Sequence, residues 1–312
     1  MRTRIRLFGT FRLARGNDQP VRLATRRAQE LLSFLVLNRH RRHSREALAT
    51  LLWDGSSPAQ SRKYLRHTLW QVQAALDCHP RQRNAALLAE PEWIGFNRHD
   101  QVWIDVLAFE EACAKVHTAA GGCLSDSDAD ALKGAVELYH GDLLQDWYCE
   151  WCRPERERLQ HLLIAAFDRL IEHAELQHRY DAGIEYGQRV LKCDRARERT
   201  HCVLMRLYYL AGDRTAALRQ YERCVSALHD ELDVAPARTT VALYDEIRAD
   251  RLAGAPSAVG VPAIAPSAAP ERDALSRLQT LLTDTQAKIE EGLTAVGEAL
   301  TAHGSGRTGP GR

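Results

Sequence analysis

The period of the hydrophobic pattern changes at Thr25, and this change most restricts what the chain can fold into. Before it, apolar residues alternate with arginines across 5–13, which predicts a half-buried strand that turns at Gly9. A second short strand is expected at 21–23. After Thr25, apolar residues recur at intervals of three and four across 28–36, which predicts a helix with one apolar face. The chain therefore opens with a small sheet and continues as helix.

Two further helices follow, and each has a start signal. The basic run 40–43 interrupts the first helix. Ser44 is suited to cap a second helix, because its hydroxyl can accept from free backbone N–H groups of the first turn. Ser57 and Pro58 combine a cap residue with a proline at the first helical position, so a third helix is expected over 58–76.

The third helix, PAQSRKYLRHTLWQVQAAL, has two chemically different faces. At the helical period, one narrow sector faces a core and carries Leu65, Leu69, Val72 and Leu76. The opposite half carries basic and aromatic residues, with two more polar residues on its flank: Lys63, Arg66, His67 and Trp70, then Arg62 and Gln73. Such a face suits a helix in the major groove of DNA. A solvated basic surface gives the same pattern, so the helix alone leaves both interpretations open.

The order of the predicted elements favours the first interpretation. Apolar, aromatic-rich segments follow the helices at 87–88, 93–96 and 102–107. The resulting order, β-β-α-α-α-β-β, is that of a winged helix, and the loop 97–100 would form the tip of the wing. Residues 1–100 carry 18 Lys and Arg against 8 Asp and Glu, a net charge of +10, whereas the remaining 212 carry −9. A basic module followed by an acidic one is consistent with phosphate binding by the first.

No segment of the chain has the composition of a targeting or membrane segment. The N-terminus lacks the continuous apolar core of a signal peptide, and no run approaches the ~18 apolar residues of a membrane span. We therefore expect a cytoplasmic, nucleoid-associated protein that does not enter a membrane and keeps its eight cysteines as thiols.

The second half of the chain is predicted to be helical, with a weak internal repeat. Helices are expected over 128–140 and 153–177. Beyond them, residues 183–190 align with 217–224 at an offset of 34 residues, which is the period of the tetratricopeptide (TPR) helix hairpin. Small residues at these positions let paired helices approach, and neighbouring hairpins then stack into one core. Several tyrosines at helical spacing in this region are interpreted as packing residues.

Longer motifs in both halves resemble one family of bacterial regulators. The first half contains IRLFGTFRL, RRAQELLSFLVLN, REALATLLW and SRKYLRHTLWQVQAAL. The second half contains ELYHGDLLQDWYCEWCRPERERL and, at 208–248, YYLAGDRTAALRQYERCVSALHDELDVAPARTTVALYDEIR. Together and in this order they resemble the Streptomyces antibiotic regulatory protein (SARP) family, in which an OmpR-like winged helix precedes a bacterial transcriptional activator domain.

The resemblance implies a fold class and an activity. The fold would be mainly α with small β-sheets: an N-terminal winged helix-turn-helix plus a C-terminal TPR-like helical repeat domain. The third helix would bind promoter DNA, with Arg41, Arg42 and Arg98 on phosphates. RNA polymerase holoenzyme would be contacted through Asp54, Gly55, Ser56 and Ser57. The chain departs from the family pattern at Tyr64 and His67, so its operator sequence does not follow from the resemblance.

The predicted domain boundaries are 1–107 for the winged helix and 108–251 for the activator domain. A linker rich in Ala, Pro, Gly and Ser is expected at 252–272. Apolar residues then follow coiled-coil spacing over 273–303, before a disordered tail at 304–312. This last segment would either be a self-association or partner helix, supporting a homodimer or higher oligomer on DNA, or fold back on its own chain or be only partly ordered.

Cys149 and Cys152 form a Cys-x-x-Cys pair with two possible interpretations. The pair could act as a redox switch, or it could lie at the entrance of an ordinary helix. No second Cys-x-x-Cys supplies the remaining ligands of a zinc site, so no metal is expected. Neither a P-loop nor an H-E-x-x-H motif occurs, so we expect no cofactor and no enzymatic activity.

The sequence thus predicts a DNA-binding transcriptional activator. The alternative is a TPR-type adaptor whose N-terminal module binds protein or RNA. Binding to duplex DNA that weakens steeply with salt would discriminate between them.

Overall fold

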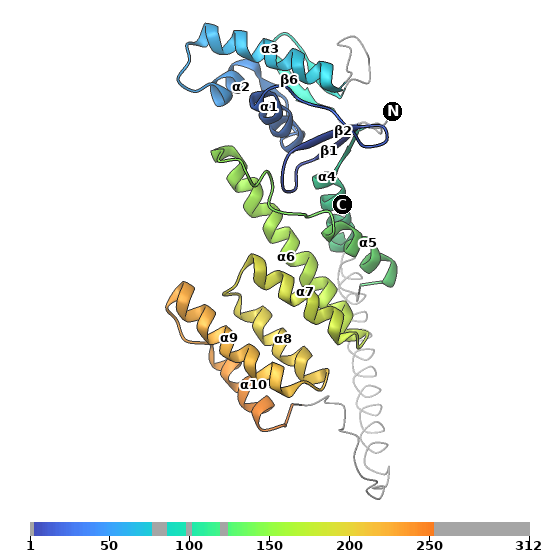
Figure 1. Ribbon diagram of the computed structural model, residues 1–312, viewed down its shortest axis with the longest axis vertical. Helices are drawn as coiled ribbons and strands as arrows, with labels where there is room; N and C mark the ends of the chain where they lie inside the picture. The colour runs from blue at the N-terminus through green and yellow to red at the C-terminus, as the bar shows by residue number, and fades with distance from the viewer. Residues whose placement is uncertain (1–2, 77–85, 98–101, 119–123, 253–312) are drawn as a thin grey trace, which may run out of the picture. The chain divides into compact units, whose positions relative to one another are not determined.

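The computed structural model describes residues 3–76, 86–97, 102–118 and 124–252 (Figure 1). The chain divides into two units, Met1–Pro256 and Ser257–Arg312, and the second lies outside the described residues. The predicted coiled-coil helix, the tail, Arg98 and all but the first residue of the predicted linker are therefore also outside the described part.

The chain opens with a four-stranded sheet in the order β3-β2-β1-β7. Its strands are β1 (Thr3–Arg6), β2 (Arg12–Arg15), β3 (Gln19–Pro20) and β7 (Val102–Ile104). β1 and β2 are antiparallel, β7 runs parallel to β1, and the turn at Gly9 is confirmed, with φ at +75°. The strand expected at 21–23 was wrong, because pairing occurs at Gln19–Pro20 on the sheet edge, where a proline without N–H is tolerated.

Three helices follow β3 along the chain and pack on one another: α1 (Arg26–Leu37), α2 (Arg45–Leu52) and α3 (Pro58–Leu76). Ser44 accepts from the backbone N–H of Ala47, which confirms the predicted start of α2. Thr25 accepts from the backbone N–H of Ala28, a cap that was not predicted. Pro58 is the first residue of α3.

A second, three-stranded sheet has the order β4-β6-β5, with β4 (His43–Ser44), β5 (Leu87–Ala89) and β6 (Trp93–Phe96). The hairpin of β5 and β6 turns between them, where the N–H of Glu90 donates to the carbonyl of Trp93 at 2.8 Å. At its open end the N–H of Asn97 donates to the carbonyl of Ala86 at 2.8 Å. The wing tip expected at 97–100 was therefore wrong. That loop leads to β7 in the other sheet, and residues 90–92 form the tip.

The rest of the described chain is helical. It comprises α4 (Asp105–Thr118), α5 (Asp126–Val136), a 3₁₀ turn η1 (Glu150–Cys152), α6 (Arg153–Leu176), α7 (Tyr180–Cys193), α8 (Glu198–Leu210), α9 (Arg214–Leu232) and α10 (Arg238–Arg248). The helix expected to reach residue 140 ends at Val136, because the N–H groups of residues 138–140 bond to carbonyls only two or three residues back.

The 34-residue repeat is visible as two helix hairpins, α7–α8 and α9–α10 (Figure 1). α7 begins at Tyr180 and α9 at Arg214, which are 34 residues apart. A Cβ added at Gly183 would lie 2.9 Å from Leu207 Cδ1, and one at Gly187 would lie 2.7 Å from Leu204 Cδ2. Both glycines thus allow α7 to approach α8. The role of Gly183 was predicted from its alignment with Ala217, whereas Gly187 aligns with Tyr221 and was not predicted.

The tyrosines of this region are packing residues. Tyr209 is buried with Met205, Ala217 and Ile247 in a small cluster beneath α10. The rings of Tyr221 and Tyr244 stack against the same cluster, with centroids 4.1 Å apart. The interpretation as packing residues is confirmed.

The winged helix and the helical region share one continuous core. Buried apolar residues run from Ile5 in β1 to Leu207 in α8. Asp105, at the start of α4, is buried and accepts from the N–H groups of Leu7, Phe8 and Val106 at 2.7–3.0 Å. Burial raises the pKa of Asp105, and these three hydrogen bonds oppose that rise. The carboxylate thereby ties the end of β1 to the first helix of the second half.

Candidate nucleic-acid interface

The apolar face of α3 is buried in the core. Leu65, Leu69, Val72 and Leu76 are between 0% and 6% exposed. Burying four aliphatic side chains contributes roughly 1.5–3 kcal/mol each relative to exposure. The rotation of α3 about its axis is therefore fixed, and with it the set of residues that it presents outward.

Six site residues were predicted on α3, and five of them have exposed side chains on the face opposite the core. Arg62, Lys63, Arg66, His67 and Trp70 are exposed, and Gln73 is half-buried at the edge. Trp70 is 64% exposed, so most of its aromatic ring is not packed in the core. Its ring stacks on His67 with centroids 6.1 Å apart. The two rings thus stand outward among the cations of this face.

The cations on this face are only weakly engaged within the protein. Arg62 donates to the carbonyl of Pro58 in its own helix at 3.1 Å. Lys63 and Arg66 form no ion pair with any residue that the structure describes. Burial, together with the positive charge of Arg66, lowers the pKa of Arg45 at the start of α2. The surface therefore has a positive potential that its own carboxylates do not neutralise.

Arg45 was missed by the sequence reasoning, although a signal was available. It follows the cap residue Ser44 directly, so it lies at the N-terminus of a helix, where backbone N–H groups favour phosphate. Its Nε donates to the carbonyl of Glu90 at 2.9 Å, which fixes the side chain beside the wing hairpin.

The predicted phosphate contacts outside α3 have different surroundings. Arg42 makes an ion pair with Glu90 at 2.8 Å, and both side chains are about half exposed. This pair fastens the segment before α2 to the wing. Arg41 is exposed, and its charge helps burial to lower the pKa of His43. Arg98 lies outside the described residues.

The loop between α2 and α3 forms a projecting corner. Gly55 adopts φ at +87°, a conformation that side chains with a Cβ rarely take. A cavity of about 190 Å³ is lined by the loop residues Asp54, Gly55 and Ser56. The fourth loop residue, Ser57, precedes Pro58, which also lines the cavity. Trp53 and Arg62 line the same cavity. The predicted polymerase-contacting segment is thus next to the proposed DNA-contacting face.

Cys149 and Cys152 lie where the helical region meets α1. The thiol of Cys149 donates to Glu30 at 3.7 Å, and Cys152 is fully buried. Burial raises the pKa of both thiols, that of Cys152 to about 12, and the carboxylate of Glu30 adds to the rise. At neutral pH both therefore remain thiols, whereas redox-active cysteines are usually thiolates. Among the described residues, no group of three or more His, Cys, Asp or Glu side chains could hold a metal ion.

The residues around these cysteines attach the two halves of the chain to each other. We call residues 146–152 the clasp. Trp147 stacks on Phe11 with ring centroids 6.2 Å apart, and the guanidinium of Arg26 lies 5.3 Å from its ring. Trp151 packs edge-on against Phe34 at 5.3 Å. The helical region thus contacts α1 directly, and α1 in turn packs on α3.

The fold and the site define a class of protein. Residues 104–248 match the family model of the bacterial transcriptional activator domain, and a winged helix precedes them. The chain therefore carries this domain in the order found in regulators of the SARP type, and it is a transcriptional regulator of that type. This result agrees with the expectation that the chain is not an enzyme, because the relatives that it matches are transcriptional regulators.

The similarity extends to curated and solved proteins. The chain is 28% identical over 236 residues to the transcriptional regulatory protein MoaR1 of Mycobacterium tuberculosis, covering 75% of each chain. It is 26% identical over 230 residues to the transcriptional regulatory protein EmbR of Mycobacterium bovis, covering 73% of this chain and 59% of EmbR. A structure of M. tuberculosis EmbR in complex with a low-affinity phosphopeptide superposes with a TM-score of 0.68 at 25% identity. That comparison covers 80% of this chain and 66% of the EmbR chain.

The described residues contain no helix that is both long and apolar enough to cross a membrane.

Proposed function

We propose that this regulator is a sequence-specific DNA-binding activator whose α3 lies in the major groove of promoter DNA. The observation that carries the proposal is the division of α3: one face is buried in the core, and the other presents Lys63 and Arg66, which have no ion pair among the described residues, and the exposed ring of Trp70. A helix in the major groove needs such a face, because base edges are read by long polar side chains.

The side chains of α3 differ in the contact that each is suited to make. Arg66, near the middle of the helix, can form a bidentate pair with a guanine edge. Lys63 and Arg62, nearer the N-terminus, suit phosphate contacts that set the register. His67, Trp70 and Gln73 would complete the face toward the C-terminal end. Phosphates on either side would be contacted from Arg41, Arg42, Arg45 and Arg98.

Activation requires a second surface, and the corner at Asp54–Ser57 supplies one. It is adjacent to α3, so a partner bound there would sit close to the DNA. We propose RNA polymerase holoenzyme as that partner and a homodimer or higher oligomer as the DNA-bound form. Both proposals follow from the family resemblance and the position of the corner.

The alternative function is an adaptor that binds protein or RNA. Measuring the affinity for duplex DNA at several salt concentrations distinguishes it from the proposed DNA-binding regulator. Genome-wide mapping of binding sites would supply the cognate duplex, and fluorescence anisotropy would give its affinity. For duplex DNA, log affinity should fall with log salt at a slope of about −0.9 per phosphate contacted. A chain that shows no such slope on any mapped duplex is not a DNA-binding regulator of the proposed kind.

Arg66→Ala tests the role of α3 within this function. The substitution should weaken binding to the cognate duplex by roughly 1–3 kcal/mol and relax discrimination at one base position, if Arg66 reads a base edge. Arg199→Ala is a matched control, because Arg199 is equally exposed but lies on α8. Unchanged affinity in the Arg66 variant would remove this residue from the interface.

A further inference from the structure

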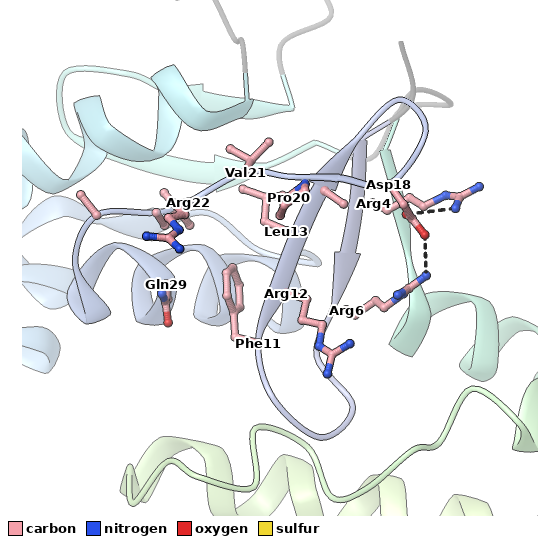
Figure 2. A pocket seen from close by; sticks show the side chains of 13 residues that line it. Arg4, Arg6, Phe11, Arg12, Leu13, Asp18, Pro20, Val21, Arg22 and Gln29 are labelled. Carbon is pink, nitrogen blue, oxygen red and sulfur yellow. Dashed lines mark hydrogen bonds and ion pairs between the residues drawn. The ribbon is translucent and has the colours of Figure 1, made fainter.

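A basic cavity of about 790 Å³ lies on the four-stranded sheet, and the DNA-binding function does not use it (Figure 2). Four arginines line it: Arg4 and Arg6 from β1, Arg12 from β2, and Arg22 from the segment before α1. Volumes of this order are typical of sites for small molecules.

The strand alternation shows that three of these arginines point away from the helices. Ile5 and Leu13 are paired across β1 and β2, and both are buried on the face that packs on the core. Arg6 and Arg12 are the next pair, so they occupy the opposite face, and Arg4 shares it. The outer face of the sheet therefore forms one side of the cavity, and Leu13, Leu23 and, from α1, Gln29 line its other side (Figure 2). None of the residues that line it belongs to α3.

Positive charge in the cavity exceeds what the protein itself neutralises. Asp18 pairs with both Arg4 and Arg6, at 3.1 and 3.3 Å. Arg12 and Arg22 are exposed and form no ion pair within the described ranges. With one carboxylate for four guanidinium groups, the cavity attracts anions, and guanidinium matches phosphate by forming two parallel hydrogen bonds.

The cavity also has an apolar part. The ring of Phe11 stands between Arg22 and Arg12, and Val21 lies above it in Figure 2. Phe11 is half-buried, so part of its ring is available for stacking. A ligand that satisfies both parts carries phosphate groups for the arginines and a flat ring for Phe11.

We infer that this cavity binds a small organic phosphate with a planar ring, of the nucleotide type. It is unrelated to a P-loop, which the chain lacks, because the phosphates would be held by side chains of a sheet. The ligand is a regulator of the protein and takes part in no reaction.

A ligand bound in the cavity would be close to both the clasp and the DNA-contacting helix α3. Phe11 stacks on Trp147 of the clasp, so a ligand on one side of this ring adjoins the contact to the helical region. The segment after Arg22 leads to Thr25, whose hydroxyl donates to Gln71 of α3 at 3.0 Å. The cavity thus lies between the clasp and the DNA-contacting helix, a position from which a ligand can alter DNA affinity.

Isothermal titration of the full chain with ATP, GTP and inorganic tripolyphosphate, in EDTA and without DNA, tests the inference. We expect at least one nucleotide to bind, and Arg12→Gln/Arg22→Gln to weaken its binding about tenfold or more. Phe11→Leu should weaken nucleotide binding but leave tripolyphosphate binding within about twofold. The matched control is Arg199→Gln/Arg219→Gln, which removes two exposed arginines from the helical region and should leave the affinity unchanged.

Three results would overturn the inference. The first is an absence of nucleotide binding, and the second is equal binding by the Arg12/Arg22 variant and the wild type. The third is a nucleotide-free Arg12/Arg22 variant that binds cognate duplex with a reduced salt slope, because these arginines would then be DNA phosphate contacts. The titration contains no DNA, so its failure is distinguishable from failure of the proposed function. Thermal unfolding of each variant shows whether it remains folded.

Discussion

The two helix glycines Gly187 and Gly134 should respond differently to the same substitution. Glycine inside a helix costs about 1 kcal/mol relative to alanine, so Gly→Ala is stabilising wherever a Cβ fits. Gly134, in α5, has no atom within 4 Å of an added Cβ, and it is exposed. Gly134→Ala should therefore raise the free energy of unfolding by up to about 1 kcal/mol.

At Gly187 the same Cβ has no room. It would lie 2.7 Å from Cδ2 and 2.9 Å from Cγ of Leu204. Cγ cannot be moved away by rotating the end of the side chain, and Leu204 is fully buried. Overpacking of this kind costs about 1–3 kcal/mol, which offsets or exceeds the gain in helix propensity. Gly187→Ala should therefore be less stable than Gly134→Ala by about 1–3 kcal/mol.

Urea unfolding followed by circular dichroism at 222 nm measures this difference, and thermal unfolding provides a second estimate. For a chain of this size each kcal/mol corresponds to roughly 2–4 °C in Tm. If Gly187→Ala proved as stabilising as Gly134→Ala, the close approach of α7 and α8 would be wrong. The assignment of Gly187 as the residue that permits it would then fail.

Two further predictions concern buried groups. Asp105→Ala should lower the free energy of unfolding by about 3 kcal/mol or more in urea unfolding, because three backbone N–H groups lose their acceptor; a loss below about 1 kcal/mol would contradict this. Because burial raises the pKa of Asp105 in the folded chain, ionisation of this carboxyl destabilises the fold. The contribution of Asp105 to the free energy of unfolding should therefore rise as pH falls through the folded pKa. Cys152, with a thiol pKa of about 12, should react with iodoacetamide at pH 8 roughly 10³-fold more slowly in the folded chain than after unfolding. Mass spectrometry would measure both rates, and fast labelling of the folded chain would instead favour the redox interpretation.

The helix starts could be predicted from the sequence because their causes are local. Ser44 caps α2 through a hydrogen bond that reaches only three residues along the chain. Thr25 caps α1 in the same way, although only the change of period was predicted there. The division of α3 into two faces is equally local, since it depends only on the helical period. The 34-residue offset likewise indicated a close approach at Gly183, which aligns with the small residue Ala217.

The errors arose where partners are distant in sequence. Their apolar, aromatic-rich composition predicts that 93–96 and 102–107 are strands, but it does not say which strand each one pairs with. The second strand ends at Ile104, because α4 begins at Asp105. β7 joins the first sheet by pairing with β1, almost a hundred residues earlier, whereas β6 pairs with β5 and β4. The loop at 97–100 therefore connects two sheets, and the wing tip is one turn earlier. Likewise, Arg4, Arg6 and Arg12 were interpreted only as the polar half of a strand, because the cavity that they line also needs Arg22 and α1.

The Cys-x-x-Cys segment shows how a local motif can have a structural role that only the fold reveals. Its cysteines suggested chemistry, but both sulfurs are held as thiols. The arginine-rich run after it has a different role, since Arg156 donates to the carbonyls of Leu143, Leu144 and Trp147 at 3.0–3.2 Å. These bonds fix the chain on which Trp147 stands against Phe11. A change in the helical region can therefore reach the winged helix through this stacked pair, at the wall of the cavity proposed to bind a phosphorylated ligand.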